Sequence, residues 1–221
     1  MSPLRTLPVA LAGLLAACAG PMRAARDNPL PPPAQGRAGI REPDAGPARG
    51  VAPVRASAVT RPLPRALAVE RAVGTAARLV GAREIAVDGV RYGDRCAALV
   101  RAAYAQAGAP LPAEADPREL HALARDRGAA RRWAPAAGDL AFLADRPGGP
   151  VEHVGLVESA AGDGTAVVLH LTEHGVARFR VNLGKAWKLK GEDGRTVNDL
   201  LVVGGGRLPA GRLLVGYARL L

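Results

Sequence analysis

The chain of 221 residues, 48% of them hydrophobic, is long enough for one compact domain with additional segments. Its net charge of +10 is concentrated at the front, because residues 1–65 contain nine arginines and only three acidic residues. Aromatic residues make up 3% of the chain, and no basic run is interleaved with them. Since the sequence also lacks zinc-ligand spacing and any nucleic-acid-binding motif, we predict no nucleic-acid partner.

The first residues have the pattern of an export signal. Arg5 precedes an apolar run from Leu7 to Ala17, which is too short to cross a bilayer, since a span takes about 20 apolar residues. The run ends at Leu15-Ala16-Ala17-Cys18, which resembles the lipobox of bacterial lipoproteins. The resemblance implies a signal peptide at residues 1–17 and a lipid on Cys18; an ordinary signal peptide with an incidental Cys is the alternative. In similar lipoproteins, an Asp after the Cys retains the protein at the inner membrane. Here Ala19 stands in that position, so the resemblance implies an outer-membrane lipoprotein facing the periplasm.

Residues 18–62 form a predicted tether. Ten of the 47 residues from Ala19 to Arg65 are proline, and no apolar periodicity is sustained. Such a segment cannot bury enough apolar surface to offset the entropy of ordering it. We therefore expect a disordered Pro/Ala/Arg-rich linker of polyproline character, followed by a folded domain at residues 63–221.

The folded part is predicted to contain helices first and strands second, from helical spacing of apolar residues and then short β-like runs. Predicted helices span Ala66–Val80, Cys96–Ala107 and Pro117–Arg127, and predicted strands span Asp139–Ala144, His153–Ser159, Ala166–Thr172, Val176–Asn182 and Leu213–Leu220. Between the first two helices, Ile85–Tyr92 is a β-like or loop segment with an Asp88-Gly89 turn. This order predicts an α+β fold, with N-terminal helices packed on a central antiparallel sheet.

Cys96 is the candidate nucleophile. It shares a helix face with Leu99, Val100 and Ala103, and it lies in the predicted first turn. Unpaired N–H groups there carry about half a positive charge, so we expect the pKa of the thiol to fall below its usual ~8.5. If Cys18 is lipidated, Cys96 has no disulfide partner, and a lone thiol in an oxidising compartment favours a functional role. A buried structural cysteine fits the same position.

The residues around Cys96 resemble the catalytic helix of NlpC-type cell-wall peptidases, a papain-like family. The family motif is Asp-Cys-Ser-Gly, an aliphatic pair and an aromatic residue; here the chain reads Arg95-Cys96-Ala97-Ala98-Leu99-Val100, followed by Tyr104. In the family, the acid before the Cys is associated with a free amino group of the peptide stem. Here the acid stands one place earlier as Asp94, which is either a substrate-binding residue or the helix N-cap. Tyr92 either matches a family tyrosine near the nucleophile or simply packs.

A second part of the resemblance lies around His153. The segment Pro135–Leu143 resembles the family's Pro-Gly-Asp-Leu-Val-Phe-Phe stretch, and His153-Val154-Gly155-Leu156 resembles its His-Val-Gly-Ile strand, which carries the catalytic base. On a strand, His153 and Gly155 share one side, and we expect the glycine to leave room for a substrate or for the Cys96 helix. The implied role of His153 is to take the thiol proton and return one to the leaving amine.

The family's third residue is polar, often His, on the next strand. In the predicted strand Ala166–Thr172, His170 follows three apolar residues, so the resemblance implies that it orients His153. His174 is the rival, but it precedes Gly175 and is expected in a turn. His170 and His174 are four residues apart, which is the spacing of metal ligands on a helix, whereas the segment that contains His170 is predicted as a strand. We therefore expect no metal site and no cofactor.

The resemblance implies a papain-like domain that cleaves amide bonds of peptidoglycan stem peptides, with Cys96, His153 and His170 as the catalytic residues. The backbone N–H of Cys96 is a candidate oxyanion donor. Two alternatives stay open: a related CHAP-type N-acetylmuramoyl amidase, and a catalytically inactive cell-wall-binding protein, to which Arg95 and the Ala97-Ala98 pair point. The expected partners are stem peptides and, through the lipid on Cys18, the membrane. We expect a monomer, and the resemblance leaves residues 184–212 unexplained.

Overall fold

The computed structural model describes residues 63–203 and 206–221. The predicted signal peptide, Cys18 and the tether at residues 18–62 lie outside them and stay predictions. The helices are α1 (Arg65–Arg78), α2 (Ala98–Gln106), α3 (Pro117–Asp126) and α4 (Ala210–Leu213), and the strands are β1 (Ile85–Val87), β2 (Val90–Gly93), β3 (Ala130–Arg131), β4 (Leu140–Leu143), β5 (His153–Ala160), β6 (Ala166–Thr172), β7 (Gly175–Val181), β8 (Leu200–Val203), β9 (Gly206–Pro209) and β10 (Leu214–Ala218). None of these helices combines the length and the apolar character that a membrane span requires.

The three predicted helices are confirmed to within two residues at each end. Helix α3 begins where its sequence encodes a capping box: Glu119 N–H donates to the Asp116 carboxylate at 2.8 Å, and Asp116 N–H donates to the Glu119 carboxylate at 2.9 Å. Beyond α1, Gly81 adopts a φ of 87° and donates its N–H to Val176 O at 2.8 Å. The chain after α1 is therefore tied to β7.

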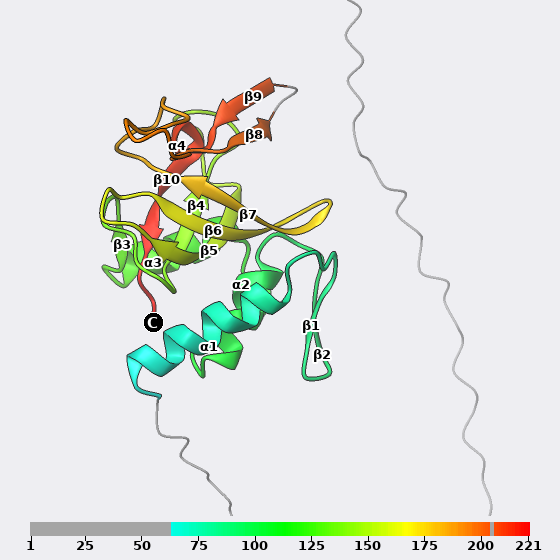
Figure 1. The fold of residues 1–221 in the computed structure, drawn as a ribbon. Helices are drawn as coiled ribbons and strands as arrows, with labels where there is room; N and C mark the ends of the chain where they lie inside the picture. Colours follow the sequence, from blue (N-terminus) through cyan, green and yellow to red (C-terminus); the bar gives the residue numbers. More distant parts are fainter. Residues whose placement is uncertain (1–62, 204–205) are drawn as a thin grey trace, which may run out of the picture. The chain divides into compact units, whose positions relative to one another are not determined.

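Six strands form one antiparallel sheet in the order β3-β10-β4-β5-β6-β7. The five predicted strands correspond to β4, β5, β6, β7 and β10, and the segment with the Asp88-Gly89 turn forms the separate hairpin β1-β2. Figure 1 shows this hairpin projecting beside α2, away from the main sheet. The mixture of helices and antiparallel sheet confirms the α+β class.

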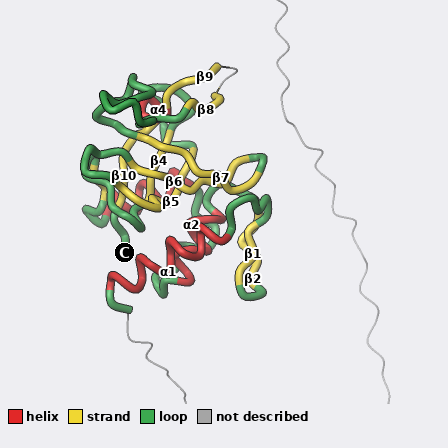
Figure 2. Tube along the Cα trace, viewed as in Figure 1, coloured by secondary structure: helices red, strands yellow, loops and turns green. Residues whose placement is uncertain are grey.

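Apolar residues are buried on both faces of the sheet. In β4, Leu140 and Phe142 belong to a first core with residues of α1, α2 and α3, whereas Ala141 and Leu143 belong to a second core with Ala210 and other residues of the α4 region. In Figures 1 and 2, helices α1 and α2 lie on one side of the sheet, and α4 with the β8-β9 hairpin lies on the other. Burial on both faces explains why β4 is a continuous apolar run and not an alternating one.

The segment after β7 is fixed by two buried asparagines. Asn198 Oδ1 accepts a hydrogen bond from Asn182 N–H at 2.8 Å, and Asn198 Nδ2 donates to the carbonyls of Lys185 and Lys188 at 2.9 and 2.8 Å. Lys185 Nζ also lies 2.8 Å from the Asp163 carboxylate. The segment that begins at Lys185 is therefore attached to the domain. It leads into β8, β9 and α4, which the sequence patterns did not predict.

A partly buried ion pair joins the beginning of β4 to the end of β10. The Asp139 carboxylate is fully buried and pairs with Arg219 through two contacts of 2.8 and 3.0 Å. It also accepts the N–H of Ala136 at 2.9 Å, while Tyr104 of α2 donates its hydroxyl proton to Gly138 O at 2.8 Å. These contacts fix the turn before β4, to which the sequence resemblance gave no function.

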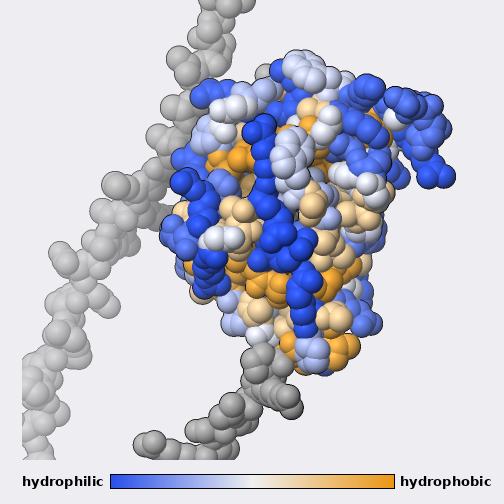
Figure 3. Space-filling model, turned by 90° about the vertical axis from the view of Figure 1, so that its left-hand side faces the viewer, coloured by the Kyte–Doolittle hydropathy of each residue, from blue (hydrophilic) through white to orange (hydrophobic). Residues whose placement is uncertain are grey.

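The lower half of the face in Figure 3 carries most of its hydrophobic surface, and hydrophilic residues dominate the upper part. This lower region corresponds to the beginning of α1 and the C-terminus in Figure 1. Leu63, Leu220 and Leu221, at the two ends of the described domain, are partly buried against the first core. The two ends of the described domain therefore complete the same apolar cluster.

Candidate active site

Cys96 lies in the turn that leads into α2, two residues before the helix begins. The predicted helix began at Cys96, whereas the first turn is closed by Ala98 N–H donating to Arg95 O at 2.8 Å. No side chain caps α2, so the predicted N-cap role of Asp94 is wrong. The thiol is partly buried and packs against the first core.

Cys96, His153 and His170 lie together, although long stretches of chain separate them. Cys96 Sγ is 3.2 Å from His170 Nε2, and Val154 N–H donates to the sulfur at 3.3 Å. The sulfur and one ring nitrogen from each histidine all lie within 4.8 Å of one another, and the two rings meet edge to face with centroids 5.4 Å apart. The histidine in direct contact with the thiol is His170, whereas the motif resemblance implied His153 in that place.

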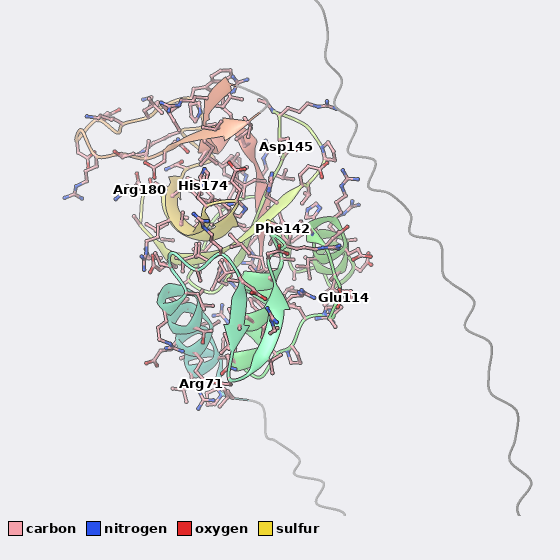
Figure 4. The ribbon with its side chains drawn as sticks, turned by 90° about the vertical axis from the view of Figure 1, so that its right-hand side faces the viewer. Arg71, Glu114, Phe142, Asp145, His174 and Arg180 are labelled. Atoms are coloured by element: carbon pink, nitrogen blue, oxygen red, sulfur yellow. The ribbon has the colours of Figure 1, made fainter. Side chains whose placement is uncertain are left out.

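Asp145 is a member of this site that the sequence patterns did not indicate. Its Oδ1 lies 2.7 Å from His153 Nε2. Strand pairing explains the approach, because His153 at the start of β5 lies opposite Leu143 of β4, two residues before Asp145. In Figure 4, Asp145 lies beyond the end of β4, on the side of the domain away from Arg180. A carboxylate on Nε2 fixes the ring and leaves Nδ1 available to the other members of the site.

Burial sets the protonation states of the contacting pair. Burial raises the pKa of the Cys96 thiol to about 11, although the hydrogen bond from the Val154 backbone acts in the opposite direction. Burial, with a smaller effect of His153, lowers the pKa of His170 to about 4. The expected lowering of the Cys96 pKa is therefore wrong, because desolvation outweighs the hydrogen bond from the Val154 backbone. At neutral pH the site pairs a neutral thiol with a neutral imidazole.

The lowered pKa of His170 predicts a loss of stability in acid. Between about pH 6.5 and 4, His170 is protonated in the unfolded chain but stays neutral in the folded chain. The free energy of unfolding therefore falls by up to ~3 kcal/mol as the pH decreases through this range. Urea unfolding at several pH values measures this loss. His170→Gln should flatten the profile, whereas His121→Gln, at a second histidine of lowered pKa, should change it less. Equal slopes for wild type and His170→Gln would contradict the assignment.

Gly155 does not leave room for a substrate, contrary to expectation. A Cβ added to it would lie 2.5 Å from Val168 Cγ1, 2.7 Å from Leu169 O and 3.5 Å from the Cβ of His170. The space beside Gly155 is therefore filled by strand β6. The glycine allows β5 and β6 to approach closely, which keeps His170 near the start of β5.

Gly155→Ala is expected to destabilise the domain by about 1–3 kcal/mol, because the added methyl group must displace β6. Thermal or urea unfolding measures the change. Gly162→Ala is the matched control, since nothing lies within 4 Å of the added Cβ and its φ is not positive. If both substitutions changed stability equally, close packing at Gly155 would not explain its presence.

The predicted substrate-binding residues line two hollows at the surface. Asp94 contributes to both, and Tyr92 contributes to one of them, with a volume of about 540 Å³. The other, of about 490 Å³, is lined by Arg83, Glu84, Gly93, Asp94, Thr172 and Glu173. It therefore combines three carboxylates with one guanidinium, and it adjoins Cys96 and His170 along the chain. A larger hollow of about 840 Å³ is lined by residues such as Asp163 and Lys185. Cys96, His153 and His170 line none of these three hollows.

His174 is not part of the cluster. Its side chain is 84% exposed and lies beside Glu173 in the turn between β6 and β7, in agreement with the expected turn position (Figure 4). The backbone N–H of Cys96, the predicted oxyanion donor, takes part in no turn or loop hydrogen bond between backbone groups of residues 63–203 and 206–221. Its role as an oxyanion donor stays a prediction.

No protein-family model matches the chain, and no curated protein matches it. Among solved structures, an NlpC/P60 family protein from Bacillus cereus ATCC 10987 is 19% identical, with a TM-score of 0.40, and the match covers 69% of this chain and 40% of that one. A Staphylococcus aureus Mu50 protein described as similar to lipoprotein, NLP/P60 family, is 16% identical with a TM-score of 0.40, over 73% of this chain and 43% of the other. The chain thus spans about two-fifths of the length of either protein.

Proposed function

We propose that this protein is a papain-like thiol hydrolase that cleaves amide bonds in the stem peptides of peptidoglycan. The observation that carries the proposal is the 3.2 Å contact between Cys96 Sγ, in the turn before α2, and His170 Nε2, on β6. Because His170 is neutral at pH 7, the tautomer with an unprotonated Nε2 can accept the thiol proton as the sulfur attacks a carbonyl. The motifs around Cys96 and His153 supply the substrate class, since they resemble those of NlpC-type cell-wall peptidases.

In the proposed reaction, Cys96 Sγ attacks the amide carbonyl while His170 Nε2 takes the thiol proton. The carbonyl oxygen becomes an oxyanion that the backbone N–H of Cys96 stabilises. His170 returns the proton to the leaving amine, and water then hydrolyses the thioester. His153, held by Asp145, packs edge-on against His170 and acts as a positioning residue. The roles of the two histidines are thus exchanged relative to the motif resemblance.

The hollow beside Asp94 provides a basis for substrate choice. Its three carboxylates favour a cationic group, such as a free amino group on a stem peptide. Arg91, which lines the neighbouring hollow, forms an exposed ion pair with Glu84, and His174 lies 3.3 Å from the Glu173 carboxylate. Asp94 is therefore the acid that we assign to the substrate. Tyr92 lines the neighbouring hollow, where a peptide backbone can pack.

The predicted lipid on Cys18 and the tether at residues 18–62 suit such an activity. A domain tethered to the outer membrane reaches the peptidoglycan from the periplasmic side. Several acyl chains hold a protein durably, at about 0.8 kcal/mol per buried methylene group. We therefore propose a monomeric, membrane-anchored enzyme of the cell envelope that acts without a cofactor.

Digestion of purified muropeptides, followed by mass spectrometry, tests the function. We expect fragments of the stem peptide, while the amide bond between the stem and N-acetylmuramic acid stays intact. Release of whole stem peptides from N-acetylmuramic acid would instead indicate the CHAP-type amidase. Binding to intact peptidoglycan without any cleavage would indicate the inactive wall-binding alternative.

A further inference from the structure

We propose that Cys96, His153 and His170 form a binding site for Zn²⁺ or a similar divalent transition-metal ion, which reversibly switches the thiol off. Residue spacing along the chain does not indicate this site, because its ligands come from the turn before α2 and from two separate strands. Thiolate and imidazole are the ligands that zinc prefers. Binding of the ion replaces the S–H bond by a sulfur–metal bond and releases one proton to water.

The geometry is close to that of a three-residue zinc site. Zn–S bonds of about 2.3 Å and Zn–N bonds of about 2.0–2.1 Å place tetrahedral ligand atoms about 3.3–3.6 Å apart. Cys96 Sγ and His170 Nε2 are separated by 3.2 Å, and the three ligand atoms all lie within 4.8 Å of one another. The side chain of His153 is 37% exposed, so a small rotation of its ring can close the remaining gap.

Asp145 supplies the support that zinc ligands usually have. Metal-bound histidines commonly donate their second ring N–H to a carboxylate, which orients the ring and raises its basicity. Asp145 Oδ1 occupies this position, 2.7 Å from His153 Nε2. Three protein ligands leave the fourth position open to water or to a chelator, which can bind the ion there and remove it.

The inhibitory consequence rests on the proposed thiol mechanism, whereas metal binding itself does not. An ion on Cys96 Sγ and His170 Nε2 occupies both the nucleophile and its base. Activity should therefore require an unoccupied site. Since the released proton opposes binding, inhibition should weaken as the pH decreases.

Titration of the full-length chain with Co²⁺ tests the binding, because a thiolate bound to Co²⁺ gives a charge-transfer absorption. We expect this absorption to saturate at one ion per chain, and Zn²⁺ to displace the Co²⁺. Cys96→Ser, His153→Gln and His170→Gln should abolish the absorption, and Asp145→Asn should weaken affinity about 10–100-fold. Cys18→Ser and His174→Gln are matched controls that should leave it unchanged, since Cys18 is the other cysteine of the chain and His174 lies outside the cluster.

No thiolate absorption in wild type, or an absorption that survives Cys96→Ser, would overturn the metal site. Muropeptide cleavage with Zn²⁺, and then with a chelator, tests the switch. We expect one equivalent of Zn²⁺ to stop cleavage and the chelator to restore it. Cleavage that continues while the metal is bound would overturn the inhibitory role and the thiol mechanism together, but leave the metal site standing. A protein that binds the metal but never cleaves muropeptides would refute only the proposed function.

Discussion

Replacing His170 by Gln is expected to lower kcat/KM for muropeptide cleavage by about 10²–10⁴-fold. Glutamine retains similar size and polarity, but it cannot accept the thiol proton, and general-base catalysis contributes an effect of this size. His170 is the residue for this test because its Nε2 lies 3.2 Å from Cys96 Sγ. Steady-state kinetics on a purified muropeptide, with a chelator present, measures the change.

His153→Gln should cost less than His170→Gln, since no direct hydrogen bond joins His153 to the sulfur and Asp145 holds its Nε2. His174→Gln should be neutral, because that side chain is 84% exposed. The wild-type profile of kcat/KM should stay level down to about pH 4, where His170 takes up a proton, and decrease below it. A larger loss for His153→Gln than for His170→Gln would restore the roles that the motif resemblance implied.

Asp139→Ala is expected to destabilise the domain by about 2–4 kcal/mol. The substitution breaks a partly buried ion pair, leaves the Arg219 guanidinium without its carboxylate, and removes the acceptor for Ala136 N–H. The lost contacts lie where β4 begins beside the end of β10, within the sheet that positions β5. Urea or thermal unfolding of the variant measures the loss.

Glu158→Ala is the matched control for this prediction. Glu158 also forms a two-contact pair with an arginine, Arg178, at 2.7 and 2.8 Å. That pair lies at the surface, where ion pairs contribute about 0–1 kcal/mol. If Asp139→Ala cost no more than Glu158→Ala, burial of the Asp139 pair would not explain the stability of the turn before β4.

Periodicity was sufficient to predict the elements that bury one or both faces. The helices α1, α2 and α3 have apolar residues at helical spacing, and β4 to β7 have compact apolar runs, so the sequence predicts both with small errors at their ends. The sequence patterns did not predict the hairpin β8-β9. Its residues are exposed or partly buried, and the sequences LLVV and GRLP do not alternate apolar with polar residues. Strand β3 has only two residues, Ala130 and Arg131, and it depends on pairing with β10.

The three candidate catalytic residues were predictable from the sequence, whereas Asp145 and the electrostatics of the site were not. Motif resemblance singled out Cys96, His153 and His170, and the structure brings them together. Asp145 has no local signal, because only the β4-β5 register brings it to His153. The raised pKa of Cys96 was unpredictable for the same reason. The sequence reveals a nearby helix end, whereas the desolvation that dominates depends on packing from distant segments.

The central claim is that Cys96 is the nucleophile, and cleavage of a purified muropeptide by Cys96→Ser tests it most directly. Serine is nearly isosteric but a much weaker nucleophile at neutral pH, so we predict a loss of turnover of about 10³-fold or more. The variant should unfold at a similar temperature to the wild type, which separates lost chemistry from lost structure. A folded Cys96→Ser protein that retained turnover within about tenfold of wild type would contradict the thiol mechanism, since a tenfold change corresponds to only ~1.4 kcal/mol of barrier.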